Sequence, residues 1–253
     1  MFLRNESFGE YIRSYKVITA IIIVNLFFFI WVDLFTFLGG AEIRGLGIGS
    51  NIHIAMGEWW RFITPIFLHG GLTHVLFNSF ALFLFGPALE QMLGRTRFIA
   101  AYLGTGIFAN VVYFYFGSPD PHLGASGAVF GLFGIYLYMV ALRKDLISNV
   151  NSQMITVIIV IGVIMTFINP QVNIIAHIFG LLSGALIAPL MLAGVRYSDQ
   201  FTERHVHDPD EIGFDPDRWR KKARLKQRIW FYAAAGLVAM IAFFAFVDFF
   251  LLP

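Results

Sequence analysis

Four polar side chains that could perform acyl transfer occur in otherwise apolar stretches of this sequence. Ser126 stands in a Gly-Ala-Ser-Gly motif that opens a long charge-free run. His74 and Asn78 lie four residues apart in a second apolar stretch, and His177 lies in a third. A serine becomes a useful nucleophile when a neighbouring base accepts its proton, and histidines are the nearby candidates. The site would also need donors for the developing oxyanion, which the Ser126 amide, the Asn78 amide and a histidine ring could supply.

Each of these residues taken alone is explained more simply by helix packing. Ser126 precedes a stripe of glycines that would let another helix approach closely, and His177 is followed on its own face by a second stripe. The glycines of the two stripes are Gly127, Gly131 and Gly134, and Gly180 and Gly184. Polar side chains such as His74 and Asn78 can also join helices within a bilayer. The case for a catalytic site therefore rests on the occurrence of all four residues together.

The four residues share one depth, which favours a site over independent packing roles. Each lies 17 to 21 residues before the arginine that ends its stretch, and these arginines are Arg95, Arg143 and Arg196. At about 1.5 Å per helical residue, they would lie roughly 26–32 Å from the inner boundary. In a hydrocarbon core of about 30 Å, this places them in one layer near the outer surface.

An acidic third member of a catalytic triad is hard to find in the sequence. Asp120 falls in an outer loop, and Asp33 and Asp248 lie towards the outer ends of the first and last apolar stretches. The residues therefore favour a Ser–His dyad of Ser126 and His177. No Cys is present, which rules out disulfides, thiolate metal sites and a cysteine nucleophile.

The composition predicts an all-α, polytopic membrane helix bundle. Hydrophobic residues make up 58% of the chain and charged residues only 13%. Seven stretches are long and apolar enough to be candidate spans: 17–38, 68–89, 98–116, 124–142, 154–169, 173–194 and 229–250. The predicted organisation is a core of six transmembrane helices over 1–195, a charged cytoplasmic linker over 196–228 and a seventh helix over 229–253. The fifth stretch looks short, and Asn169-Pro170 sets its outer limit.

The distribution of basic residues predicts the orientation. With the N-terminus in the cytoplasm, 16 of the 18 Lys and Arg residues fall on the cytoplasmic side, and only Arg44 and Arg61 fall outside. The C-terminus would then lie outside, and the cell membrane of a bacterium is the expected location. Adjacent Trp59 and Trp60 suit the headgroup region. The basic half of the linker is expected to meet anionic lipid headgroups.

The linker also contains His205 and His207 beside Asp208 and Asp210, a combination that could be read as a metal site. A solvated polar segment is the simpler interpretation. The sequence predicts no metal, no cofactor and no nucleic-acid partner, and it does not indicate an oligomeric state.

The chain resembles the rhomboid family of intramembrane serine proteases, of the six-plus-one transmembrane type. The matching motifs, over about 12–195, are Glu58-Trp-Trp-Arg61, His69-(x4)-His74-(x3)-Asn78, Glu90-(x3)-Gly94, Gly124-Ala-Ser126-Gly127 and Ala176-His177-(x2)-Gly180-(x3)-Gly184. The resemblance implies that Ser126 is the nucleophile and His177 its base, and that His74 and Asn78 help the Ser126 amide hold the oxyanion. It also implies that the fifth span and the loop from Phe167 to Asn173 gate and cap the site. Phe130 stands where the family often has tyrosine, so it could pack on the His177 ring but not hydrogen-bond to it.

Three functions remain to be weighed. The leading one is hydrolysis of peptide bonds in membrane-anchored proteins near the outer face; the resemblance implies substrates with an unstable transmembrane helix and small residues around the cut. An α-helix hides its carbonyls in hydrogen bonds, so the substrate must unwind. A non-catalytic rhomboid-like protein that binds transmembrane clients is the alternative, although Ser126 and His177 are both retained. A transporter or channel would need a polar path to both sides, whereas the inner halves of the relevant stretches are almost wholly apolar.

Overall fold

The computed structural model describes residues 1–196, apart from 3, 5 and 171, and these residues are organised as helices without a named strand. They belong to a contact unit that spans 1–202, while a second unit spans 203–253. The predicted seventh helix, nearly all of the linker, and His205 and His207 lie outside the described residues. The prediction of an all-α membrane helix bundle is confirmed, and the six-plus-one count stays a prediction.

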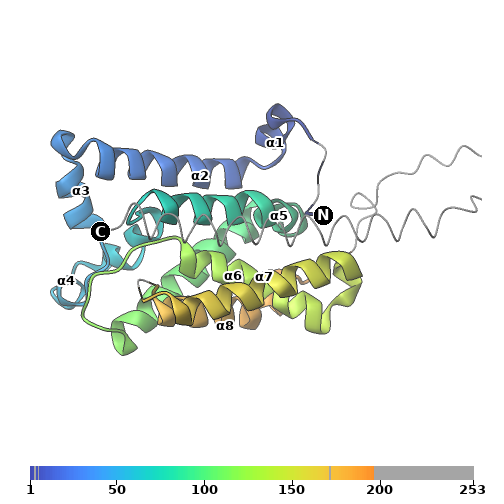
Figure 1. The fold of residues 1–253 in the computed structure, drawn as a ribbon. Coiled ribbons are helices and arrows are strands. Elements are labelled where there is room, and N and C mark those ends of the chain that lie inside the picture. Colours follow the sequence, from blue (N-terminus) through green and yellow to red (C-terminus); the bar gives the residue numbers. More distant parts are fainter. Residues whose placement is uncertain (3, 5, 171, 197–253) are drawn as a thin grey trace, which may run out of the picture. The chain divides into compact units, whose positions relative to one another are not determined.

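The main helices follow one another as shown in Figure 1. Their bounds are α1 Phe8–Ser14, α2 Lys16–Phe29, α3 Gly40–Gly47, α4 Asn51–Ala55, α5 Leu72–Phe116, α6 Ser126–Leu142, α7 Asn149–Ile168 and α8 Ile174–Met191. A π-turn, η1 (Ile30–Leu34), extends α2, and short 3-10 turns are η2 (Thr36–Leu38), η3 (Trp59–Phe62), η4 (Thr64–Phe67) and η5 (Lys144–Leu146). In Figure 1, α3 and α4 lie at the opposite end of the bundle from α1.

Four helical stretches in the described part of the chain are long and apolar enough to cross a bilayer: Lys16–Leu34, Leu72–Phe116, Asn149–Ile168 and Ile174–Met191. The second, α5, is two helices joined at Gly94, whose φ of +73° is the left-handed conformation that glycine adopts readily. The apolar helix α6 is shorter. Helix α7 begins at Asn149, before the predicted residue 154, because the Ser148 hydroxyl caps it by accepting from the Asn151 amide. The expected short fifth span is therefore wrong.

A buried carboxylate joins α2 to α5 at the start of α2. No side chain of the preceding residue caps this helix, so its first N–H groups need other partners. The Glu90 carboxylate of α5 accepts hydrogen bonds from the Val17 and Ile18 amides, both at 3.0 Å. Glu90 is buried, and its negative charge lies at the positive end of α2. This contact fixes where α2 begins against α5.

The N-terminal segment is hydrogen-bonded to α5 beside a proline. Pro87 lies inside α5 and has no N–H, which leaves the carbonyl of Phe83, one turn earlier, without its helical donor. Arg4 donates to that oxygen at 2.9 Å and to the Leu84 carbonyl at 3.2 Å, and the Tyr11 hydroxyl also donates to Phe83 at 3.2 Å. The segment thus supplies donors in place of the one N–H that the proline lacks.

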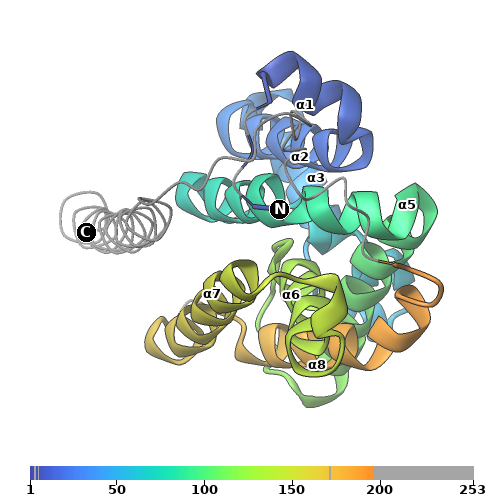
Figure 2. The same cartoon turned by 90° about the vertical axis from the view of Figure 1, so that its right-hand side faces the viewer.

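Helix α6 is the central helix of this unit. It packs against α5, α7 and α8 (Figure 2). Of its 17 residues, 11 are buried. Basic residues gather at the end where α6 finishes: Arg97 donates to the Met191 and Ala193 carbonyls, and Arg143 donates to the Val195 carbonyl. The bend in α5 and the C-terminal ends of α6 and α8 therefore lie together. The first residue of α6 lies at the opposite end of the bundle, where α8 begins.

Candidate active site

Ser126 is the first residue of α6, and an extended segment carries the chain to it from the end of α5. His122 in this segment exchanges two backbone hydrogen bonds with Gly49, each at 2.9 Å, and the Gly124 amide donates to the Pro65 carbonyl at 2.9 Å. Non-helical backbone is tolerated at membrane depth when protein groups satisfy its hydrogen bonds. The segment can therefore return into the bundle and start α6 among other helices.

The glycine stripes bring the turn that carries Ser126 against the turn that carries His177. A side-chain carbon added to Gly180 of α8 would overlap the Gly127 carbonyl oxygen, so the two backbones touch. Gly127 is also in contact range of Ala176, the residue before His177. Ser126 and His177 therefore lie on adjoining turns of two helices in backbone contact. Within the described residues, no hydrogen bond joins the Ser126 hydroxyl to the His177 ring.

The His177 ring is held on two sides. Its plane stacks on the Phe130 ring of α6, with centroids 4.1 Å apart and 20° between the planes. Its Nδ1 lies 2.8 Å from the Thr166 hydroxyl oxygen of α7. The Asn173 side chain caps α8 by accepting from the Ala176 amide at 2.9 Å, which places His177 at the end of the first turn. Three helices thus determine the position of one buried imidazole.

His74 and Asn78 lie on the first turns of α5, beside the segment that leads to Ser126. A side-chain carbon at Gly124 would come within 2.7 Å of the His74 ring and 3.6 Å of the Ser126 hydroxyl, so Gly124 lies between them. Its φ of +135° also favours glycine at this position. The Asn78 amide donates to the His74 carbonyl at 3.1 Å and is buried. The structure therefore brings Ser126, His74 and His177 to one region, with Asn78 one turn below His74.

Known proteins of similar sequence decide the family. The model of the Rhomboid domain matches residues 56–194, more than half of the chain. The chain is 46% identical over 192 residues to the Bacillus subtilis protein named "Putative rhomboid protease YdcA", covering 74% of this chain and 94% of that protein. It is 41% identical over 142 residues to Bacillus subtilis "Rhomboid protease GluP", of which it covers 28%, and 33% identical over 164 residues to Arabidopsis thaliana "RHOMBOID-like protein 9, chloroplastic". The chain belongs to the rhomboid family. Membership in this family and the protease names support an integral membrane protein with protease activity.

Two further histidines of this rhomboid protein are buried near the site, outside the spanning helices. Burial, followed by the neighbouring His74 ring, lowers the pKa of His69 to about 3, and the two rings are 5.2 Å apart. Burial also lowers the pKa of His122 to about 4, and its ring packs on Tyr113. Both imidazoles are therefore neutral at neutral pH, so neither places a positive charge beside His74 or the segment before Ser126.

The acidic residues considered for a triad have other partners. Asp33 pairs with Arg44 at 2.9 Å, and Asp120 accepts from the Ser118 hydroxyl at 2.9 Å. Asp248 lies outside the described residues. In the part of the chain that the structure describes, no group of three or more His, Asp or Glu side chains is arranged to hold a metal ion. In these residues, the hydrogen-bonding partner of the His177 ring is a threonine.

Thr166 is the residue of this region that the sequence did not reveal. Its hydroxyl is a polar group in an otherwise apolar C-terminal half of α7, 11 residues before His177 and four after Gly162. The position of Gly162 could have been a signal, since a small residue one turn away often marks a helix contact. An isolated threonine in a membrane helix more often bonds only to its own backbone, so its position in the sequence does not point to a partner on another helix.

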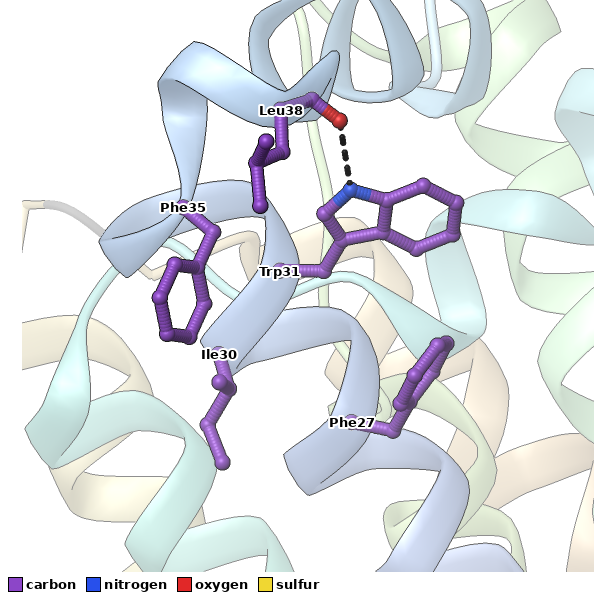
Figure 3. A pocket seen from close by; sticks show the side chains of 5 residues that line it. All are labelled: Phe27, Ile30, Trp31, Phe35 and Leu38. Carbon is purple, nitrogen blue, oxygen red and sulfur yellow. Dashed lines mark hydrogen bonds between the residues drawn. The ribbon is translucent and has the colours of Figure 1, made fainter.

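An apolar pocket elsewhere in the protein has no such chemistry. Figure 3 shows its lining side chains, which are Phe27, Ile30, Trp31, Phe35 and Leu38, and the 3.0 Å hydrogen bond from the Trp31 indole to the Leu38 carbonyl. None of these side chains is a nucleophile or titrates near neutral pH. The pocket is formed by α2 and the turns that follow it, rather than by the helices that carry the four predicted residues.

Proposed function

We propose that this rhomboid protein is an intramembrane serine endopeptidase in which Ser126 and His177 form the catalytic dyad. The observation that carries the proposal is the backbone contact between the first turns of α6 and α8, which sets the serine beside the turn that holds the buried histidine. Stacking on Phe130 and the contact with Thr166 restrain the imidazole, and a restrained imidazole stays aligned with the groups between which it transfers a proton.

The chemistry follows from these residue types. As the Ser126 oxygen attacks the substrate carbonyl carbon, His177 accepts the hydroxyl proton, and the carbonyl oxygen becomes an oxyanion. His177 then donates that proton to the leaving amine, and the C–N bond breaks to leave an acyl-enzyme. Water then attacks the ester as His177 takes its proton, and His177 returns that proton to the Ser126 oxygen as the acyl–oxygen bond breaks and the second product leaves. Histidine suits both roles because its ordinary pKa lies near neutral pH.

Three groups would stabilise the oxyanion. The Ser126 amide is among the first N–H groups of α6, which have no partner within the helix, and it lies at the positive end of the helix dipole. His74 lies across Gly124 from the Ser126 hydroxyl. The Asn78 amide carries two hydrogens, of which one goes to the His74 carbonyl, so the second could reach an oxyanion.

The substrates we propose are transmembrane proteins that unwind near the outer face of the membrane and carry small residues around the cut. The proposed location is a bacterial cell membrane, with the N-terminus and the linker 196–228 in the cytoplasm and lipid headgroups around the basic residues. The gathering of Arg97 and Arg143 at the end opposite Ser126 supports this orientation. The core would comprise 1–195, with α7 and the loop after it as gate and cap.

The test is covalent labelling with a fluorophosphonate, followed by mass spectrometry. The proposal expects labelling at Ser126 that is lost in Ser126→Ala. Cleavage of a fluorescent transmembrane peptide should be abolished in Ser126→Ala and in His177→Ala, and the double variant should be no worse, because the two act as one unit. Asn78→Ala and His74→Ala should each lower the rate by about 10²–10³-fold at most, since other donors remain. A folded wild-type protein that binds the peptide without cleavage or labelling would instead indicate a client-binding protein.

A further inference from the structure

The Thr166 hydroxyl makes two short contacts, and only one of them can use its hydrogen. Its oxygen lies 2.7 Å from the Gly162 carbonyl oxygen, one turn earlier in α7, and 2.8 Å from Nδ1 of His177. A carbonyl oxygen can only accept, so the threonine hydrogen points to Gly162. Towards His177 the hydroxyl can then offer only a lone pair. In this arrangement Nδ1 carries the proton, and the Thr166 oxygen accepts it.

This proton assignment determines the state of the other ring nitrogen. A neutral imidazole has one N–H and one lone pair, so protonation at Nδ1 leaves the lone pair on Nε2. Nε2 is the nitrogen at the far end of the ring from Thr166, and it is the one left free to accept a proton from a serine hydroxyl. Thr166 is only 1% exposed, so its hydroxyl is shielded from bulk solvent.

We propose that Thr166 is a positioning residue that holds His177 in the Nδ1–H tautomer and fixes which ring edge faces Ser126. The inference rests on the proposed role of His177 as the base for Ser126. Thr166 touches neither the substrate nor the serine; it acts through the imidazole, in the place where a serine hydrolase with a triad has a carboxylate.

Stacking alone could not perform this task. The Phe130 ring restrains the plane of the imidazole. A 180° rotation of the ring about its Cβ–Cγ bond would still exchange each nitrogen with a carbon, without loss of stacking. A hydrogen bond to one nitrogen removes that freedom. Gly162 serves the same arrangement, since a side-chain carbon there would lie 3.2 Å from the Phe130 ring. One turn of α7 thus contacts both the stacking ring and the histidine.

The decisive variants differ only in the hydroxyl. Thr166→Val keeps the side-chain shape and removes the acceptor, whereas Thr166→Ser keeps the hydroxyl. Thr156→Val is the matched control, because the Thr156 hydroxyl makes the same bond to its own helix, to the Ser152 carbonyl at 2.7 Å, and contacts no histidine. We expect Thr166→Val to lower kcat by about 10–100-fold with little change in KM, and Thr166→Ser and Thr156→Val to stay near the wild type.

The tautomer is read directly by ¹⁵N NMR of the full-length, histidine-labelled protein in micelles, with the His177 signals identified by their loss in His177→Gln. The wild type should show protonated Nδ1 and unprotonated Nε2, and Thr166→Val should show a mixture or the other tautomer. Protonated Nε2 in the wild type would overturn the inference even if every variant misfolded, and so would wild-type kcat in Thr166→Val. If Ser126 is labelled and Thr166→Val has the wild-type kcat, the role of Thr166 is refuted while the proposed function stands. Absent labelling and turnover in the wild type would remove the proposed function and this inference with it.

Discussion

The strongest structural constraint on the site is the contact between α6 and α8, and Gly180→Ala tests it. A side-chain carbon at Gly180 would overlap the Gly127 carbonyl oxygen and lie 3.1 and 3.3 Å from the Gly127 carbonyl carbon and Cα. Ordinary contacts between carbon atoms are about 3.5–4.0 Å, and the overlap with the oxygen is more severe, so the helices must separate by about 1 Å. Backbone atoms cannot rotate away as a flexible side chain would.

That separation should affect both stability and catalysis. Forcing extra volume into a packed contact typically costs about 1–3 kcal/mol, which should lower the Tm of the detergent-solubilised protein. Because Gly180 is three residues from His177, the same shift should move the base relative to Ser126. A displacement of about 1 Å can reduce the rate about 10²-fold. Single-turnover cleavage of a transmembrane peptide would measure this loss in protein verified as folded by gel filtration.

Gly104→Ala is the control for this experiment. Gly104 is an exposed residue within α5, and a side-chain carbon there would meet nothing within 4 Å. Alanine is favoured over glycine in a helix by roughly 0.5–1 kcal/mol, so this variant should be as stable as the wild type or slightly more, with full activity. If Gly180→Ala matched Gly104→Ala in both Tm and rate, the backbone contact between α6 and α8 could not be what positions the dyad.

Three further results are expected. Glu90→Gln should lose a charge-assisted bond to the start of α2, which should lower the stability by about 1.5–3 kcal/mol. Glu42→Gln, at an exposed position, should leave the stability unchanged. Equal Tm values for the two variants would contradict the capping role of Glu90. Arg4→Gln should lower the Tm by removing the guanidinium that donates to the carbonyl freed by the α5 proline and pairs with Glu6. Arg13→Gln loses a hydrogen bond and a charge interaction within α1 alone, and it should change the Tm little. A tag inserted near Glu211 should resist external protease in right-side-out membranes, and its digestion from outside would refute the proposed orientation.

The sequence was sufficient for the class of fold. Long apolar runs have to be helical in a bilayer, because each backbone polar group must find its partner locally. The family was also accessible, since the motifs around Ser126, His177, His74 and Asn78 occur together and in order. Element ends were less secure: α7 starts at Asn149 because of a serine cap, which a hydropathy pattern does not detect.

The depth argument from the sequence predicted that the four residues share one layer, but it could not supply their contacts. It used only distances along helices, which are regular at about 1.5 Å per residue. It could not show that Gly124 lies between His74 and Ser126, or that the Asn78 amide already donates one hydrogen to the His74 carbonyl. Such facts depend on the path of the segment before α6, whose hydrogen bonds go to residues far away in the chain.

The residue types and their order were therefore determined by the sequence alone, because a serine, a histidine and stripes of small residues are local properties of the chain. The partner of His177 was decided only by the tertiary structure. Thr166 belongs to a different helix, and its hydroxyl reaches Nδ1 because α7 packs beside α6 with Gly162 on the Phe130 ring. A hydrogen bond between helices requires two side chains within about 3 Å, and no spacing in the sequence encodes that distance.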